Sequence, residues 1–258
     1  MKSRFTIKHL EDKRAMLNLG CGTKMNWNWT NLDFSPYARL VRHMNIAKIF
    51  RKVGVVSEER YQNLLEVDPN IILWDLRKGV PFNNNTFDVV YHSHLLEHID
   101  KTNAPVFLKE CFRVLKPNGI IRIAVPDLQS IINRYNSAVS RLENGDMKAF
   151  SDHRKSTYEL FDQMVRKETT GTEEQRFALR FIERIVRGNA AKVGELHRWM
   201  YDEYSLRELL LDVGFENVQT ESPTTSKIEG WAQFNLDTNK DGSIYKPESL
   251  YIEGIRKE

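Results

Sequence analysis

Short apolar runs alternate with longer amphipathic segments along this 258-residue chain. Such alternation is typical of a fold in which strands and helices follow one another around a mainly parallel sheet. We expect strands at seven segments, residues 15–19, 30–33, 71–74, 87–91, 119–125, 217–220 and 250–254. The pattern predicts an α/β, Rossmann-like fold whose seven-stranded, mostly parallel sheet carries helices on both faces.

Two segments have helical spacing and recognisable ends. Residues 106–115 place apolar side chains on one face and stop at a Lys-Pro-Asn-Gly turn. Residues 205–213 form the second predicted helix, with Ser205 as N-cap, Glu208 completing a capping box and Gly214 just past the end.

The remaining segments divide the chain into three parts. Residues 1–127 form a core that contains a helical insertion at about 37–68, and residues 197–258 complete it with the last helix and an antiparallel strand pair. Between them, residues 128–196 are long, charge-rich and helix-forming, which predicts an inserted helical lid. About ten residues join the first two strands, fewer than a parallel crossover usually needs. We therefore expect a loop there, with Trp27 or Trp29 packing where a helix would lie.

Composition narrows the class of protein. The net charge is only +3 on 38 basic and 35 acidic residues, which gives no support for a nucleic-acid partner. Cys21 and Cys111 are too far apart for a metal motif and suggest no disulfide framework, as expected in a reducing compartment. No apolar stretch resembles a signal peptide or reaches the roughly 20 residues that span a bilayer. We expect a soluble, cytoplasmic protein.

Glycines and carboxylates stand at successive strand ends. Gly20 and Gly22 follow the first strand, Asp33 ends the second and Asp75 follows the third. Glycine lets the backbone approach a ligand closely because it has no Cβ. Carboxylates at the carboxyl edge of an open α/β sheet commonly hold a ribose and a base. The series predicts a site for an adenosine-like molecule.

Several ordered motifs extend this pattern. They are LNLGCG at 17–22, NLD at 31–33, DL at 75–76, PF at 81–82, FDVV at 87–90, LEHI at 96–99 and RVLKPNG at 113–119. On these motifs the chain resembles the class I S-adenosylmethionine-dependent methyltransferases, over residues 15–126 and again over 204–221. The resemblance implies S-adenosylmethionine as cofactor and S-adenosylhomocysteine as product.

The resemblance also implies roles for the glycine turn. Gly20 and Gly22 would pass their backbone against the methionine part of the cofactor, and Asp33 would accept hydrogen bonds from the ribose. Asn18 stands where many members of the family have an acidic residue. No third glycine follows Gly22, which counts against an NAD enzyme. Asp33 could alternatively be a local capping group for the helix that starts at Ser35-Pro36.

By the same resemblance, Asp75 with Leu76 would recognise adenine, and Ser93 or His92 would flank the sulfonium. Asp75 could instead simply pair with Arg77.

Histidines supply the candidate catalytic groups. His94 and His98 lie four residues apart, so on a helix they would share a face as bases or substrate-orienting groups. Glu97, between them, is either a catalyst or a structural anchor. No third metal ligand is evident near this pair, and we predict no metal site. His197 precedes the last helix, where similar methyltransferases keep a His–aromatic run that faces the acceptor; Asp127 is a further candidate for substrate contact.

Two other patterns leave alternatives open. Four arginines of the inserted block recur at helical spacing: Arg176, Arg180, Arg184 and Arg187. They would form either a solvated helix face or a site for an anionic, phosphate-bearing acceptor. Asp237, Asn239, Asp241, Gly242 and Glu248 match a calcium loop. Because residues 250–254 have a strand pattern where a helix should follow, we favour a hairpin turn over a calcium site.

The sequence thus predicts a methyltransferase that acts on a small-molecule or sugar-type acceptor, for example in cell-surface polysaccharide biosynthesis. The alternatives are a cofactor-binding module without turnover and an RNA methyltransferase. The latter would need a basic, aromatic groove, and the mixed charge of the insertion does not suggest one. The acceptor, the methylated atom and the oligomeric state stay open.

Overall fold

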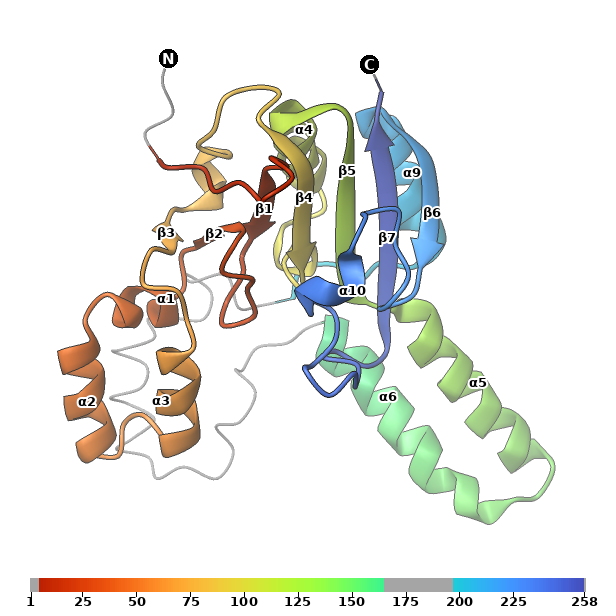
Figure 1. Cartoon of the computed structure of the whole chain (residues 1–258). Coiled ribbons are helices and arrows are strands. Elements are labelled where there is room, and N and C mark those ends of the chain that lie inside the picture. Colours follow the sequence, from red (N-terminus) through yellow and green to blue (C-terminus); the bar gives the residue numbers. More distant parts are fainter. Residues whose placement is uncertain (1–4, 165–196, 258) are drawn as a thin grey trace.

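A computed structural model describes residues 5–164 and 197–257. One seven-stranded sheet runs through the molecule in the order β3-β2-β1-β4-β5-β7-β6 (Figure 1). Its strands are β1 (Met16–Leu19), β2 (Thr30–Asp33), β3 (Ile72–Leu73), β4 (Phe87–Ser93), β5 (Leu115–Pro126), β6 (Phe215–Glu221) and β7 (Ser249–Arg256). Neighbours among β1–β5 are parallel, whereas β7 runs antiparallel to both β5 and β6. The predicted α/β sheet is confirmed.

The strand order reverses direction beside β1. The chain moves outward from β1 to β2 and β3, then returns to place β4 on the other side of β1. In open α/β sheets, ligands bind beyond the carboxyl ends of the strands at such a switch point. Leu19 pairs with both Leu32 and His92, so the ends of β1, β2 and β4 lie at one edge.

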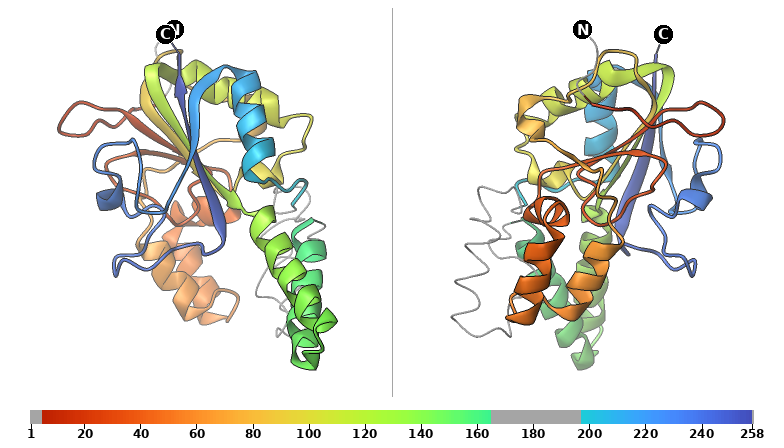
Figure 2. Two further views of the ribbon diagram at one scale, coloured as in Figure 1. Left: turned by 90° about the vertical axis from the view of Figure 1, so that its right-hand side faces the viewer. Right: turned by 60° about the vertical axis from the view of Figure 1, so that its left-hand side comes forward.

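The helices surround this sheet unevenly. The α-helices are α1 (Pro36–Val41), α2 (Met44–Lys52), α3 (Glu58–Leu65), α4 (Ala104–Val114), α5 (Leu128–Glu143), α6 (Phe150–Met164), α9 (Glu203–Val213) and α10 (Trp231–Phe234). Three short 3-10 turns are η1 (Leu76–Lys78), η2 (Leu96–His98) and η3 (Met147–Ala149). Figure 2 shows α4 and α9 on one side of the sheet and α10 on the other.

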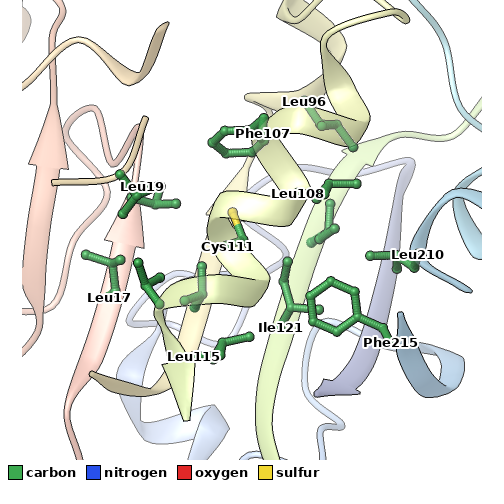
Figure 3. Close-up of a cluster of buried hydrophobic side chains, with 14 of the residues drawn as sticks. Leu17, Leu19, Leu96, Phe107, Leu108, Cys111, Leu115, Ile121, Leu210 and Phe215 are labelled. Atoms are coloured by element: carbon green, nitrogen blue, oxygen red, sulfur yellow. The ribbon is translucent and has the colours of Figure 1, made fainter. Parts of the chain in front are cut away.

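The main core lies between the sheet and the α4–α9 layer. Phe107, Leu108 and Cys111 of α4 are buried against strand residues such as Leu19 and Ile121 (Figure 3). Burial of each large apolar side chain stabilises the fold by roughly 1.5–3 kcal/mol. This layer fixes β1, β4 and β5 relative to one another, and with them the edge where the strands end.

The opposite face is covered mainly by irregular chain. Trp29 is fully buried and meets Tyr91 and Trp231 edge to face, with ring centroids 6.3 and 6.1 Å away, while Trp27 is 54% exposed. The loop between β1 and β2 therefore supplies a tryptophan in place of a helix, as the short connection predicted. Helical cover on this face is limited to the single turn of α10 among the residues described.

Two local predictions were wrong in detail. The N-cap of α9 is Asp202, whose side chain accepts from the Ser205 N–H, and Ser205 completes the capping box in return. Ser205 lies inside the helix because the extended backbone ends at Asp202. The turn expected after α4 lies within β5, where Asn118 adopts a left-handed φ of +62° and the pairing with β4 shifts register. Gly214 caps α9 in the left-handed conformation, as predicted.

Two helical groups lie beyond the carboxyl edge of the parallel strands. One comprises α1, α2 and α3, which lie between β2 and β3, and the other is the α5–α6 hairpin (Figure 1). The hairpin belongs to the inserted block, whose role as a lid stays a prediction. The four arginines of that block, Arg176, Arg180, Arg184 and Arg187, lie outside the described residues. Within residues 5–164 and 197–257, no helix has the length and apolarity needed to cross a membrane.

Candidate active site

The glycine turn after β1 is tied to the end of β2. The Gly22 N–H donates to Oδ2 of Asp33 over 2.8 Å, and Oδ1 of Asp33 accepts from the Ser35 N–H. Asp33 is 6% exposed and is thus held in a fixed position. Ser35 itself caps α1 by accepting from the Ala38 N–H. Both sequence interpretations of Asp33 are therefore compatible, because a carboxylate can accept about four hydrogen bonds and only two are used here.

The two glycines differ in what surrounds them. Both have left-handed backbones, with φ +62° at Gly20 and +53° at Gly22. A Cβ on Gly20 would lie 3.0 Å from Leu95, whereas a Cβ on Gly22 would meet no atom within 4 Å. Open space beside a backbone that only glycine adopts easily is what close approach of a ligand requires. The turn fits the methionine end of S-adenosylmethionine on this observation.

Asp75 lies at the same edge, after β3, and is bonded locally. It caps η1 by accepting from the Arg77 N–H, and it forms a two-point ion pair with the Arg77 guanidinium, the closest atoms being 2.7 Å apart. The hydrogen bonds from Arg77 hold the pKa of Asp75 below its usual value. The pairing weighed as an alternative is therefore present. Leu76 is partly buried against the main core, and recognition of adenine by Asp75 and Leu76 stays a prediction.

Asn18 and Cys21 have structural surroundings. The Asn18 side chain is buried and donates to the Lys24 carbonyl and to Oδ1 of Asn31, which braces the glycine turn. Burial raises the pKa of the Cys21 thiol, which keeps it protonated. A buried thiol of this kind packs as a small, unreactive side chain.

The histidines at the end of β4 and just after it have different surroundings. His92 is fully buried and meets Phe107 edge to face, with ring centroids 5.4 Å apart. Desolvation lowers the pKa of His92 to about 3, so it is neutral and belongs to the core. Ser93 ends the strand, and His94 follows with a left-handed φ of +50°. His94 and His98 therefore do not share a regular helix; a bent loop and η2 connect them.

Several polar side chains beyond β4 lie around Glu97. Its side chain is 1% exposed, with Oε1 lying 3.3 Å from Nδ1 of His94 and 3.9 Å from Nε2 of His98. On its other ring nitrogen, Nε2, His94 is 2.9 Å from Oγ of Ser249. Tyr201 is 2% exposed, and its pKa is raised to about 12 by burial and by the negative charge of Glu97. A buried carboxylate therefore lies close to two imidazoles and a phenol in this corner.

The chain that returns after the inserted block adds His197 to this group. The Glu97 carbonyl accepts from the Arg198 N–H at 2.7 Å and from the Trp199 N–H at 3.3 Å, which holds this segment against η2. The His197 ring consequently lies edge to face with His98, with centroids 4.8 Å apart. We call Glu97, His98 and His197 the acceptor-side cluster; one ligand atom from each lies within 4.8 Å of the others.

Sequence spacing showed only part of this cluster. His98 and His197 were singled out, and Glu97 was weighed as catalyst or anchor, but nothing in the spacing indicated that they meet. The cluster is not the His94–His98 pair with a third ligand but a different set, because the backbone bonds to Glu97 bring His197 in from about 100 residues away. Sequence reasoning also did not single out Tyr201, whose hydroxyl is buried and has no hydrogen-bond partner in the described structure.

The calcium-loop interpretation is not supported by the contacts of its first residue. Asp237 is buried, accepts from the Tyr91 hydroxyl at 2.6 Å and bonds Nε of Arg122 at 2.8 Å. Glu248 bonds Arg134 instead of turning inward. Asp241 accepts from the Ser243 N–H in a turn. This is the hairpin turn that the sequence favoured.

Asp127 lies between the end of β5 and the start of α5. It caps α5 by accepting from the Gln129 N–H, and burial raises its pKa. A groove of about 620 Å³ opens beside it between α5 and α6. The cationic side chains that line it, Arg134, Arg141 and Lys155, already form ion pairs with acidic neighbours. Direct contact of Asp127 with a substrate stays a prediction.

Comparison with known proteins agrees with this geometry. Residues 17–123 match the family model described as a methyltransferase domain. The chain is 25% identical over 127 residues to the Probable methyltransferase ltbC of Aspergillus luteorubrus, covering 46% of this chain and 42% of that protein. The match thus spans less than half the length of that relative.

Solved structures show low overall similarity. The DhpI–SAH complex has a TM-score of 0.44 and 13% identity, covering 94% of this chain and 76% of that one. A SAM-dependent methyltransferase of Thermotoga maritima, described as a possible histamine N-methyltransferase, has a TM-score of 0.38 and 14% identity, covering 94% and 82%.

The sheet order, the glycine turn, the strand-end carboxylate and the family match define the class together. The chain carries a class I S-adenosylmethionine-dependent methyltransferase domain, with S-adenosylmethionine as its cofactor. The resemblance stated from the sequence is confirmed at this level.

Proposed function

We propose that this protein transfers the methyl group of S-adenosylmethionine to a hydroxyl oxygen of a small, polar, sugar-type acceptor. The observation that carries the proposal is the acceptor-side cluster, which groups a buried carboxylate with two imidazoles just past the end of β4. A hydroxyl is a weak nucleophile until its proton is removed, so an acceptor of this kind needs a positioned base.

The proposed cofactor site uses the edge of β1 and β2. The Gly20–Gly22 backbone would hold the methionine part, Asp33 the ribose, Asp75 with Leu76 the adenine, and Ser93 would lie beside the sulfonium. S-adenosylmethionine supplies an electrophilic methyl group whose sulfur leaves as a neutral thioether. The fixed edge orients the acceptor oxygen in line with that methyl, and such positioning can lower a barrier by roughly 7–11 kcal/mol.

The histidines divide into contact and positioning roles in this proposal. Both ring nitrogens of His94 face other protein groups, Ser249 and Glu97, so His94 acts as a positioning residue for the carboxylate. His98 and His197 contact the acceptor, and its hydroxyl proton leaves at the acceptor-side cluster. The buried Tyr201 hydroxyl is available to donate to an acceptor oxygen.

The sugar-type acceptor, and a place in cell-surface polysaccharide biosynthesis, are the finer parts of the proposal. Their support is the polar character of the cluster, since hydroxyl-rich ligands need several hydrogen-bonding partners. An acceptor bearing phosphate is the anionic version of the same hypothesis. A binding module without turnover and an RNA methyltransferase remain as outcomes that the test can return.

The test is a transfer assay with S-adenosylmethionine labelled in the methyl group. The purified protein is incubated with four panels: free sugars, nucleotide-linked sugars, small carboxylates and RNA. Label in a sugar or nucleotide-linked sugar supports the proposal. Label only in carboxylates or RNA would overturn the acceptor class. Cofactor binding without transfer to any panel would favour the binding module.

A further inference from the structure

We propose that Glu97, His98 and His197 bind a first-row divalent cation, with Zn²⁺ as the best fit. The inference deepens the proposed function by assigning a cation to the acceptor side, but the binding itself can be tested without any acceptor. One carboxylate oxygen and two imidazole nitrogens lie within 4.8 Å of one another.

The donor set suits a transition metal ion. Two histidines and one glutamate form the protein ligands of many catalytic zinc sites, which leave further positions for water or substrate. Tetrahedral ligands of zinc stand about 3.4 Å apart, so the observed 3.9 Å between Oε1 of Glu97 and Nε2 of His98 needs only a small side-chain adjustment. Mg²⁺ and Ca²⁺ prefer all-oxygen sites and should bind poorly.

The contacts of His197 orient it as a ligand. Its Nδ1 lies 3.0 Å from the Gln163 carbonyl, which can only accept, so Nδ1 carries the proton. The lone pair of the neutral ring is then on Nε2. A backbone carbonyl on the far nitrogen is the usual outer partner of a metal-binding histidine, because it fixes both tautomer and ring orientation.

Glu97 has a corresponding outer partner in His94, whose Nδ1 lies 3.3 Å from Oε1. The Glu97 side chain is 1% exposed, so its carboxylate is held inside the cluster beside His98. The same residues would otherwise form a metal-free network of a carboxylate and imidazoles, which is the alternative that the test must separate.

A cation here would define the acceptor more closely. With His98 and His197 as ligands, neither imidazole would act as the base. The ion would instead lower the pKa of the acceptor hydroxyl and so make its proton easier to remove. The remaining coordination positions would favour an acceptor with two adjacent oxygens, such as a vicinal diol or a hydroxyl beside a carbonyl.

The test is a titration of the chelator-treated full-length protein with Co²⁺, Zn²⁺ and Mg²⁺. We expect one Co²⁺ per chain with visible absorption of a four- or five-coordinate site, displacement by Zn²⁺, and no competition by Mg²⁺. Glu97→Gln and His197→Ala should each weaken binding by at least about 100-fold, since even outer partners contribute 10–100-fold. The control His43→Ala, a surface histidine at the start of α2 whose side chain forms no capping hydrogen bond, should bind as the unaltered protein does.

Thermal unfolding without metal shows whether each variant is folded, and a folded His197→Ala protein suffices if Glu97→Gln is not. Absence of the cobalt spectrum, or equal binding by His197→Ala and the unaltered protein, would overturn the inference. Methyl transfer at an unchanged rate in metal-free protein would also overturn it while leaving the proposed function intact. Metal binding without transfer to any acceptor would overturn the proposed function alone.

Discussion

Oδ2 of Asp33 accepts a hydrogen bond of 2.8 Å from the backbone N–H of Gly22. This bond joins the end of β2 to the turn that follows β1, and these are the two segments that would hold the ribose and the methionine part of the cofactor. The cofactor site is thereby preorganised by a residue that would also contact the ligand.

Replacing Asp33 tests that double role. Asp33→Asn keeps the shape but removes the charge and one acceptor oxygen. Hydrogen bonds to charged groups contribute about 1.5–3 kcal/mol, so we expect the Kd for S-adenosylhomocysteine to rise by at least tenfold in calorimetry. Asp212→Asn, on an exposed position of α9, is the control. Equal affinity in both variants would mean that Asp33 has no part in binding.

Gly22 and Gly54 form a matched pair for the glycine turn. Both have left-handed backbones and open space where a Cβ would stand, but Gly54 lies between α2 and α3. Gly22→Ala and Gly54→Ala should each lower the free energy of unfolding by roughly 1–2 kcal/mol from backbone strain. Only Gly22→Ala should lose cofactor affinity. If both variants bind normally, the space beside Gly22 is not used by the ligand.

His98 should affect turnover and not cofactor binding. His98→Ala should leave the Kd for S-adenosylhomocysteine unchanged and slow methyl transfer by about 10²–10⁴-fold, the usual contribution of a positioned acid or base. His43→Ala provides the control for loss of an imidazole. Rates equal to those of the unaltered protein would remove His98 from the mechanism.

Acid should destabilise the fold through His92. Its folded pKa of about 3 lies below the unfolded value of 6.5, so the unfolded state binds the proton more readily and stability falls as pH drops from 6.5 toward 3. Between pH 7 and pH 5 the loss from this group is about 2 kcal/mol. Urea unfolding of His92→Leu should show a smaller loss over that range by about this amount. An identical pH dependence would contradict burial of a neutral His92.

The buried ion pair of Asp237 should matter for stability, with no calcium involved. Arg122 is fully buried between Asp237 and Glu253, so Asp237→Ala leaves its charge poorly compensated and should lower the free energy of unfolding by about 3–5 kcal/mol. Asp241→Ala, in the exposed turn, should cost far less. Calcium should not shift the Tm of the unaltered protein; a clear rise would restore the calcium-loop interpretation.

The sheet could be predicted because the spacing of apolar residues along each segment reflects which of its side chains are buried. The strand at 30–33 matched β2 to the residue, and the parallel order followed from the alternation of strands and helices. The cap of α9 was misplaced by three residues because Asp202 and Ser205 both carry capping side chains, and only the backbone conformation decides between them.

The arrangement of the acceptor-side cluster could not be predicted from the sequence. Strand-end residues such as Asp33 could be placed because parallel strands end at one edge. His197 could not, since its position depends on hydrogen bonds from the backbone at Arg198 and Trp199 to the Glu97 carbonyl, which no side-chain pattern encodes. The buried ion pair of Asp237 could not be predicted either, because its partners, Tyr91 and Arg122, lie more than 100 residues away.

Calorimetry with S-adenosylmethionine and S-adenosylhomocysteine tests the central claim most directly. The account predicts that one molecule of either ligand binds per chain of the unaltered protein and that Asp33→Asn weakens both equally. No heat of binding with either ligand, from protein shown to be folded by its thermal transition, would contradict it.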